Sequence, residues 1–424
     1  MDLTYLSPLG LQDDRDFKML ESSLVQITNA QRENLEKDTK RDERKKRWAN
    51  VRPTTAQIYV ENRCNLKCQH CYESETSHPP ERYALSVDDY SRIFDELAEL
   101  GVLYVTFTGG EVFLRRDFLE IVSIARKKRF DVSIFTSGTL IDEKKSARLA
   151  QLKVQRVEIT VYSHDSAVHD AFTGVTGSHS RSVRALQLLN HAGVKTVMKS
   201  NLMTFNVEHV DGLVSLAEAV GADYQFDPTV KPRMDGDRKP LEYAVSPDKI
   251  RQLVLNRPDL YTAFQKFNPD ELCSGEKNFL SPDSVICGAA RGFISVSADG
   301  GVYACGFFPV PGGHIRESSL KDIWYGSEQF SRIRETTFGK MTACSSCDVK
   351  STCVPCMAYA EVEHRDHTQC ASSSRQMAEA VRALADRKVV VNHKLSRGKS
   401  LPIVGELEVP RPSYKSGLPA LSLE

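Results

Sequence analysis

Between residues 55 and 230, short apolar runs alternate with longer stretches in which apolar positions recur at helical spacing. The short runs have the β-branched and aromatic content that is typical of strands. Six strands are therefore expected, at AQIYVE (56–61), YVTFTG (104–109), VSIFTS (132–137), VEITVY (157–162), TVMKSNLM (196–203) and YQFDP (224–228).

The longer stretches predict helices, for example SVDDYSRIFDELAELG (86–101) and SVRALQLLNHAG (182–193), the second of which closes on a glycine. Alternating strands and helices imply parallel strands joined by crossover helices. Six repeats predict an α/β fold, namely a partial (β/α)6 barrel of the TIM type, over residues 52–240. In such barrels the functional side chains lie on loops after the C-terminal ends of the strands.

The segments around the barrel have other patterns. The stretch 31–48 mixes both charge signs and predicts either a solvated helix or a docking surface for a partner. A glycine-rich turn lies in ADGGVYACG (298–306), and a helix is expected at 372–388. The expected order is a charged helical segment (1–51), the barrel (52–240), a bridging region (241–270), a cysteine-rich domain (271–390) and a Pro-containing tail (391–424).

Charge and hydropathy exclude several classes of function. Lys+Arg and Asp+Glu both number 56 in the 424 residues, so the net charge gives no reason to expect nucleic acid or a membrane surface as partner. No apolar run reaches the roughly 18 residues that span a bilayer. The N-terminal sequence lacks the basic and apolar regions of a secretory signal, so a cytoplasmic protein is expected.

The eleven cysteines predict metal ligands or catalytic thiols, because a reducing compartment disfavours structural disulfides. Cys64, Cys68 and Cys71 form a C-x3-C-x2-C pattern directly after the first expected strand. One interpretation is a zinc site that is completed by His70 or His78. The other is a [4Fe–4S] cluster with three thiolates, in which one iron is open to a substrate or cofactor.

This cysteine loop resembles that of the radical SAM superfamily. His70 stands where the family usually has an aromatic residue, and Tyr72 follows the third cysteine. Gly109, Gly110 and Glu111 at the end of the second strand resemble the family's GGE motif, which binds the amino group of S-adenosylmethionine (SAM). Glycines permit close backbone approach, and a carboxylate accepts hydrogen bonds from an ammonium group. The resemblance also implies SAM contacts after strands three to five, with a simple polar position as the alternative at each: Thr136, Ser137, Gly138, Ser163, Lys199 and Asn201.

The cysteine-rich region resembles the SPASM extension of radical SAM enzymes. It contains C-x12-G-x4-C, then C-x2-C-x5-C-x2-C and a last cysteine. Two residues separate Cys353 from Cys356, whereas three separate the corresponding cysteines in the family. The generic alternative is a pair of zinc knuckles. By position, the resemblance assigns two auxiliary [4Fe–4S] clusters, one to Cys287, Cys305 and Cys356 and the other to Cys344, Cys347, Cys353 and Cys370. Cys273 is either the fourth ligand of the first of these or a buried free thiol, and an unligated iron there could capture a substrate thiolate.

The resemblance implies that one electron cleaves SAM to a 5′-deoxyadenosyl radical, which abstracts hydrogen from the substrate, and that the auxiliary clusters take an electron back. Most SPASM enzymes modify peptides or proteins. Sulfatase maturases carry an Asp base directly after the G-x4-C cysteine, where this chain has Gly306. Residues 224–241 look more like maturases of ribosomally made peptides, which form thioether or C–C crosslinks or oxidise side chains. Asp227, Lys231, Arg233 and Asp235 are candidate peptide contacts, with a solvated loop as the alternative.

Several partners and alternatives follow from this resemblance. The expected partners are a precursor peptide, reduced flavodoxin or ferredoxin as electron donor, and either a separate leader-recognition protein or the N-terminal helices for leader binding. A radical SAM enzyme for a small molecule, such as one that decarboxylates a tetrapyrrole side chain or a cofactor precursor, is the second hypothesis. A sulfatase-maturase-like oxidase is less favoured. A zinc-binding interaction protein without catalysis is the remaining hypothesis. The GGE motif and the alternation of predicted strands and helices argue against it.

Overall fold

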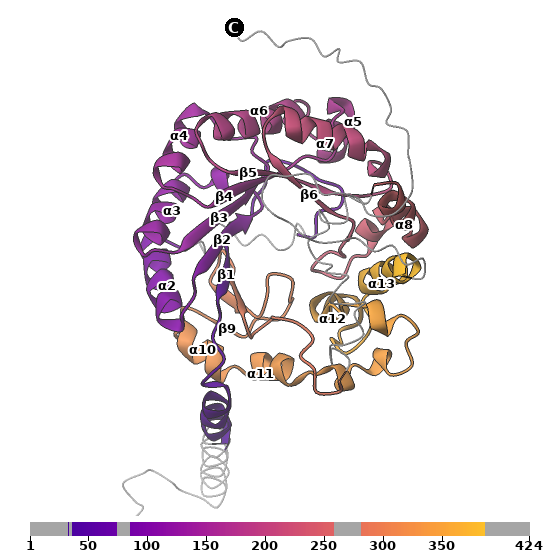
Figure 1. Cartoon of the computed structure of the whole chain (residues 1–424). Coiled ribbons are helices and arrows are strands. Elements are labelled where there is room, and N and C mark those ends of the chain that lie inside the picture. Colours follow the sequence, from indigo (N-terminus) through magenta and orange to yellow (C-terminus); the bar gives the residue numbers. More distant parts are fainter. Residues whose placement is uncertain (1–32, 34–35, 74–84, 258–280, 386–424) are drawn as a thin grey trace, which may run out of the picture.

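The computed structural model describes residue 33 and residues 36–73, 85–257 and 281–385 (Figure 1). Cys273, His78 and the tail 391–424 lie outside the described residues, as does most of the predicted N-terminal segment.

Six parallel strands form the centre of the fold, which confirms the predicted partial barrel. Each strand pairs with the next in chain order, so the barrel part of the sheet reads β6-β5-β4-β3-β2-β1. These strands are β1 (Thr55–Glu61), β2 (Tyr104–Gly109), β3 (Asp131–Thr136), β4 (Arg156–Thr160), β5 (Thr196–Asn201) and β6 (Asp223–Asp227).

A hairpin from the cysteine-rich region extends the same sheet, a feature that the sequence analysis did not predict. β7 (Phe293–Val296) runs parallel to β1, with Ala56 opposite Ile294, and continues antiparallel into β8 (Gly301–Tyr303) and β9 (Gly313–His314). β6 and β9 are therefore the outer strands of a nine-stranded open sheet. Cys287 precedes β7 and Cys305 follows β8, so this pairing places both cysteines beside the N-terminal part of β1.

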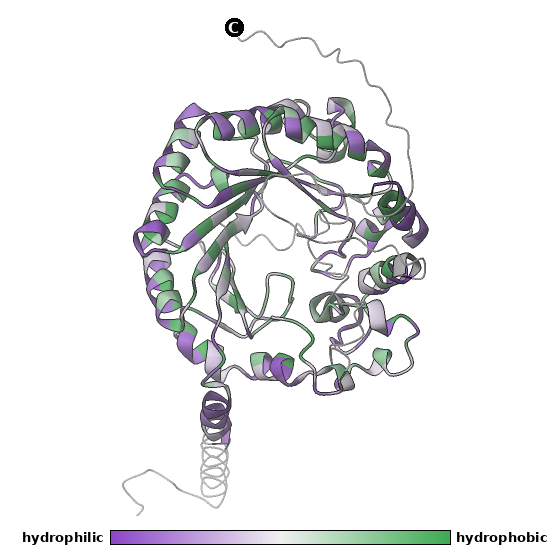
Figure 2. Cartoon of the chain, in the orientation of Figure 1, coloured by the Kyte–Doolittle hydropathy of each residue, from purple (hydrophilic) through white to green (hydrophobic). Residues whose placement is uncertain are grey.

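Helices cover the outer face of the barrel strands in an arc, while the remaining helices gather near β9 and below β6 (Figure 1). The strands and the surrounding helices both carry hydrophobic and hydrophilic residues (Figure 2), as a sheet with one polar face and amphipathic covering helices do. The α-helices are α2 (Val87–Leu100), α3 (Phe118–Lys127), α4 (Glu143–Gln151), α5 (Ser166–Thr173), α6 (Ser178–His191), α7 (Val210–Ala219), α8 (Pro247–Asn256), α10 (Leu320–Gly326), α11 (Glu328–Glu335), α12 (Met357–His364) and α13 (Ser372–Ala385). The 3-10 helices are η5 (Val112–Leu114), η6 (Val207–His209), η7 (Lys239–Tyr243), η9 (Phe338–Lys340), η10 (Thr342–Cys344) and η11 (Lys350–Thr352).

Helix α2 shows how local sequence sets these boundaries. Ser86 and Asp89 form a reciprocal capping box at its start, and Gly101 ends it in the left-handed conformation with φ 92°. Its buried face includes Tyr90 and Phe94, which pack into the continuous core that reaches from the barrel to Trp324 and Phe330 of the cysteine-rich region. None of the described helices is long and apolar enough to cross a membrane.

The helix over residues 36–48 packs against the cysteine-rich region of the same chain. Lys45 Nζ lies 2.7 Å from Asp322 Oδ1 of α10, and Arg44 Nε donates to the carbonyl of Gly326 at 2.8 Å. Trp48 Nε1 donates to Ser331 Oγ at 2.9 Å. One face of the helix over residues 36–48 therefore packs against the cysteine-rich region of the same chain, while its other residues are exposed.

Candidate active site and cluster ligands

The first three cysteines lie on the loop that directly follows β1, at the C-terminal edge of the parallel strands. The loop is tied to α5 by Lys67 N, which donates to the carbonyl of Thr173 at 2.8 Å. Burial, together with the neighbouring thiolates of Cys71 and Cys64, raises the pKa of Cys68 to about 12. The three sulfurs are thus close enough to interact electrostatically, and iron would have to displace protons to bind them.

Gly109 and Gly110 allow the end of β2 to lie against this loop. A Cβ at Gly109, whose φ is 149°, would come within 2.1 Å of the carbonyl oxygen of Glu61. A Cβ at Gly110 would come within 2.3 Å of the carbonyl oxygen of Arg63. Real Cβ atoms do not approach backbone oxygen so closely, so both positions require glycine to hold the cysteine loop in place.

Glu111 is completely buried, and protein donors surround its carboxylate. Oε1 accepts from Thr136 Oγ1 at 2.7 Å and from Phe113 N at 3.1 Å, and Oε2 accepts from the backbone N and the Oγ of Ser137 at 2.8 and 2.6 Å. A carboxylate has about four acceptor positions, so these donors satisfy it. In this structure Glu111 fixes the loop after β3, and its direct contact with the amino group of SAM stays a prediction.

A cavity of about 390 Å³ opens above the barrel strands. Most of the residues that were predicted to contact SAM line it, whereas Glu111, Ser163 and Gly138 are not among the described lining residues. The lining includes Cys64, Cys68, His70, Cys71, Tyr72, Gly109, Gly110, Thr136, Ser137, Lys199 and Asn201. Ser163 Oγ instead lies 2.7 Å from His209 Nδ1 and accepts from Asp165 N, so its hydroxyl supports the loop after β4.

His70 forms part of the apolar wall of this cavity. Its ring makes edge contacts with Tyr162 and Phe172, at centroid distances of 5.2 and 5.4 Å. Burial, together with the charge of Lys231, lowers the pKa of His70 to about 4. The imidazole is therefore neutral at pH 7 and serves, as an aromatic residue would, to pack the loop between its second and third cysteines.

The sequence analysis missed Glu158, which lies on the cavity wall and is 2% exposed. Its carboxylate pairs with Lys199 Nζ at 2.5 Å and with Arg156 Nε at 2.6 Å. Lys199 also lies over the ring of Phe135, 4.0 Å from its centroid. The sequence VEITVY contains a signal for this residue. Successive side chains of a strand point to opposite faces, so Glu158, between the apolar Val157 and Ile159, faces the barrel interior.

The remaining described cysteines fall into two groups, which we call the inner and the outer auxiliary group. Burial, together with Cys356 and Cys287, raises the pKa of Cys305 to about 12. Burial, together with Cys370, Cys344 and Cys347, likewise raises the pKa of Cys353 to about 12. The inner group is Cys287, Cys305 and Cys356, and the outer group is Cys344, Cys347, Cys353 and Cys370. All ten cysteines in the described part of the chain are free of disulfides.

The thiol chemistry of these groups fits iron–sulfur clusters, which cysteine thiolates hold. Among the described residues, no three His, Cys, Asp or Glu side chains form a site for a single metal ion. Backbone N–H groups also point at sulfur, because Leu66 N lies 3.4 Å from Cys64 Sγ and Phe307 N lies 3.4 Å from Cys305 Sγ.

A second cavity of about 380 Å³ contains the inner group. Gln57, Thr229 and Phe307 line both this cavity and the first one, so the two adjoin. Lys231 stands at this junction, with its Nζ 4.1 Å from the centroid of the Phe307 ring.

The four charged residues after β6 divide between the cavity and the surface. Asp227 and Lys231 line the first cavity. Arg233 pairs with Asp237 at 3.4 Å, and Asp237 N donates to Asp235 Oδ1, so these residues form a local turn. Met234 N donates to the carbonyl of Tyr72 at 2.9 Å, which fastens this segment to the first cysteine loop.

The partial parallel barrel, the cysteine loop after β1 and the glycine pair after β2 define a radical SAM enzyme. The sequence profile of the radical SAM superfamily matches residues 58–220, and the profile of the SPASM iron–sulfur cluster-binding domain matches residues 287–348. The chain belongs to the radical SAM superfamily and carries a SPASM domain.

Three curated relatives illustrate the range of the family. An AdoMet-dependent heme synthase of Methanosarcina barkeri is 26% identical over 72% of this chain and 91% of its own length. A PqqA peptide cyclase of Granulibacter bethesdensis is 28% identical over 82% of this chain and 95% of its own length. The mycofactocin maturase MftC of Mycolicibacterium smegmatis is 30% identical over 68% of this chain and 74% of its own length.

Solved structures share the fold. Streptococcus suis SuiB bound to its precursor peptide SuiA superposes with a TM-score of 0.60 and 18% identity, over 86% of this chain and 82% of SuiB. At this identity the likeness concerns the architecture alone.

Proposed function

We propose that this radical SAM enzyme modifies a side chain of a ribosomally made precursor peptide, by forming a crosslink or by oxidation. The observation that carries this proposal is the junction of the two cavities at Gln57, Thr229 and Phe307. A substrate side chain at this junction would lie within reach of the first cysteine loop and of the inner auxiliary group. Similarity to a PqqA peptide cyclase and to the mycofactocin maturase MftC supports a peptide as substrate.

SAM, once bound at the open iron and cleaved by one electron, would supply the radical that abstracts hydrogen from the peptide. The residues of this chain position and shield the reacting groups. Tyr162 and Phe172 hold the neutral His70 against the cysteine loop, and Glu111 positions Ser137 on the cavity wall. Lys231 and Asp227 provide one positive and one negative group for polar contacts with the peptide.

The cofactor set that we propose is three [4Fe–4S] clusters and SAM, with one cluster on each of the three cysteine groups. Cys273 is proposed as the fourth ligand of the inner group. The expected electron donor is reduced flavodoxin or ferredoxin, and a separate protein is a candidate for leader recognition. In anaerobically purified protein, Cys273→Ala should lose part of the iron of the inner group, whereas an unchanged iron content would leave an iron there open to a substrate thiolate.

The experiment that tests the substrate class uses the short peptides encoded next to the gene of this enzyme. Each peptide is coexpressed with the full chain and its mass is compared with that from coexpression with Cys64→Ala. A crosslink lowers the mass by two hydrogen atoms, and tandem spectra locate the changed residues. No change in any peptide, with SAM still cleaved to 5′-deoxyadenosine, would contradict the peptide proposal.

A small molecule is the second candidate substrate, because AdoMet-dependent heme synthases are among the relatives. Carboxylated tetrapyrroles test this alternative directly. Loss of carbon dioxide from such a compound, dependent on SAM and on Cys64, would favour it over a peptide.

A further inference from the structure

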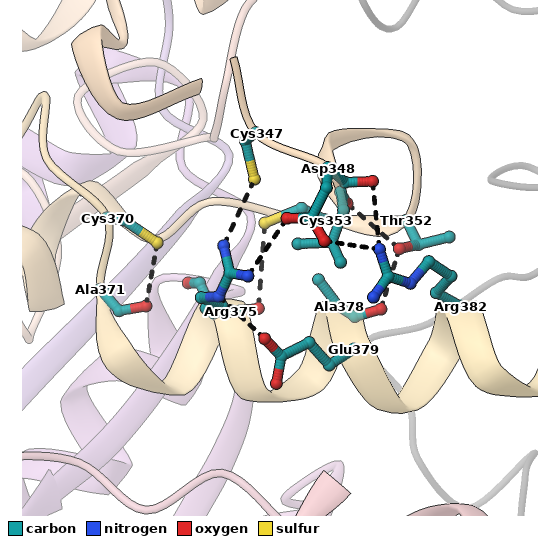
Figure 3. A network of polar contacts seen from close by, with 12 residues as sticks. Cys347, Asp348, Thr352, Cys353, Cys370, Ala371, Arg375, Ala378, Glu379 and Arg382 are labelled. Carbon is teal, nitrogen blue, oxygen red and sulfur yellow. Dashed lines mark hydrogen bonds and ion pairs between the residues drawn. The ribbon is translucent and has the colours of Figure 1, made fainter. Parts of the chain in front are cut away.

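One guanidinium group contacts the outer auxiliary group. Arg375 lies in the first turns of α13, and its Nη1 is 3.9 Å from Cys347 Sγ (Figure 3). Its Nη2 donates to Asp348 Oδ1 at 3.1 Å and its Nε donates to Glu379 Oε1 at 2.8 Å. Two carboxylates therefore hold the guanidinium in an orientation that directs its remaining edge at the sulfur.

Helix α13 is anchored on both sides of this contact. Thr352 Oγ1 donates to the carbonyl of Ala378 at 2.9 Å, and Cys356 N donates to Ser374 Oγ at 3.0 Å. Gln376 Nε2 donates to the carbonyl of Val245, which ties the same helix to the segment before α8. Arg375 therefore stands on a fixed support, and its place beside Cys347 does not depend on a free loop.

Hydrogen bonds to the sulfurs and nearby positive charge stabilise the reduced form of an iron–sulfur cluster, because reduction adds one negative charge. We propose that Arg375 raises the reduction potential of the cluster held by the outer auxiliary group. The inference rests on the proposed function, which assigns a cluster to these four cysteines. Arg375 is then a positioning residue, since it acts through the ligand sulfurs and contacts no substrate.

A matched control lies two turns along the same helix. Arg382 Nη1 is 2.7 Å from Asp348 Oδ2, so it shares a carboxylate partner with Arg375 (Figure 3). Figure 3 draws no contact between Arg382 and any of the sulfurs in view. The variant Arg382→Gln removes the same charge from the same helix without removing the guanidinium beside Cys347.

The test is a redox titration, followed by electron paramagnetic resonance, of the full chain with loaded clusters. A background of Cys64→Ala, Cys68→Ala and Cys71→Ala removes the first cluster and leaves the two auxiliary clusters. Arg375→Gln should move one of the two midpoints to a more negative potential, and Arg375→Lys should move it less because the charge remains. Arg382→Gln should leave both midpoints in place. The shift should shrink at high salt, since Arg375 is about half exposed.

Equal midpoints in Arg375→Gln and its background, with iron content unchanged, would overturn the role of Arg375. An equal shift in Arg382→Gln would overturn it as well. Loss of iron in both Arg375 variants would also overturn it, because the residue would then be needed for the structure of the cluster site. Failure of the proposed cofactor set is distinguishable, because the outer auxiliary group would then hold no iron in the background protein. Failure of the peptide proposal would leave these midpoints as predicted, because the titration contains no substrate.

Discussion

The hydroxyl oxygens of Tyr59 and Tyr72 lie 3.3 Å apart, one on β1 and the other directly after the third cysteine of the first loop. Tyr59 also donates to the carbonyl of Gly306, which follows Cys305 of the inner auxiliary group, at 3.2 Å. The ring of Tyr72 contacts that of Phe307 at a centroid distance of 5.1 Å. Two short chains of contacts therefore connect the first cysteine loop with the inner group.

Gly306 stands at the position at which, by the family resemblance, sulfatase maturases carry a carboxylate, and the ends of two side chains from β1 occupy the space beside it. A Cβ there would lie 2.7 Å from both Gln57 Oε1 and Tyr59 OH. Gly306→Ala should destabilise the loaded protein by about 1–3 kcal/mol, and Tyr59→Phe in the same chain should recover part of that loss. Thermal melting of the two single variants and the double variant measures the coupling. Strictly additive effects would show that the two residues do not compete for space.

Gly110→Ala should disrupt the first cysteine loop, because the new methyl group meets the backbone oxygen of Arg63 and not a movable side chain. The expected result is loss of SAM cleavage and of iron from the first group, with the auxiliary iron kept. Gly292→Ala is the control, since its Cβ would approach nothing closer than 3.8 Å. Full SAM cleavage by Gly110→Ala would refute the packing account of the glycine pair.

Glu111→Gln should cost about 1–3 kcal/mol, because the amide nitrogen must face one of the buried donors on Thr136, Ser137 or Phe113. The loop after β3 would then lose its fixed position, and SAM affinity should fall. Calorimetric titration with SAM and thermal melting together check both effects. Glu143→Gln serves as the control, because Glu143 forms an exposed pair with Arg184. Unchanged affinity for SAM in Glu111→Gln would separate this carboxylate from the SAM site.

Trp48→Ala should loosen the helix over residues 36–48 from α11. The indole donates to Ser331, and the guanidinium carbons of Arg334 and Arg291 lie 5.5 and 5.7 Å from its ring centroid. A loss of roughly 2 kcal/mol is expected from the buried contact, which should lower the melting temperature. Arg47→Gln removes only an exposed pair with Glu335 and should have little effect. Equal melting temperatures for Trp48→Ala and the wild type would mean that this helix does not stabilise the fold.

The sequence predicted the barrel because it depends on a local pattern of apolar runs. The assignment of the cysteines to groups came from the resemblance to the family and stays a prediction. The sequence placed the start of α6 at residue 182, four residues late. Asp170 of the preceding helix accepts from Ser178 Oγ and His179 N and so caps α6 from outside the segment. The pairing of β7 with β1 joins residues more than 230 positions apart, and no local pattern encodes it. The partners of Glu111 likewise come from η5 and from the loop after β3, so only the fold reveals that its carboxylate is saturated.

The most direct test is the iron and sulfide content of anaerobically purified protein in which one cysteine group at a time is changed to alanine. The wild type should hold about twelve irons, and variants of the first, inner or outer group should each lose about four of them. Combined variants should lose iron additively. Four irons or fewer in the wild type, with zinc present, would contradict the account. It would also be contradicted if the combined variant of two groups lost no more iron than either single-group variant.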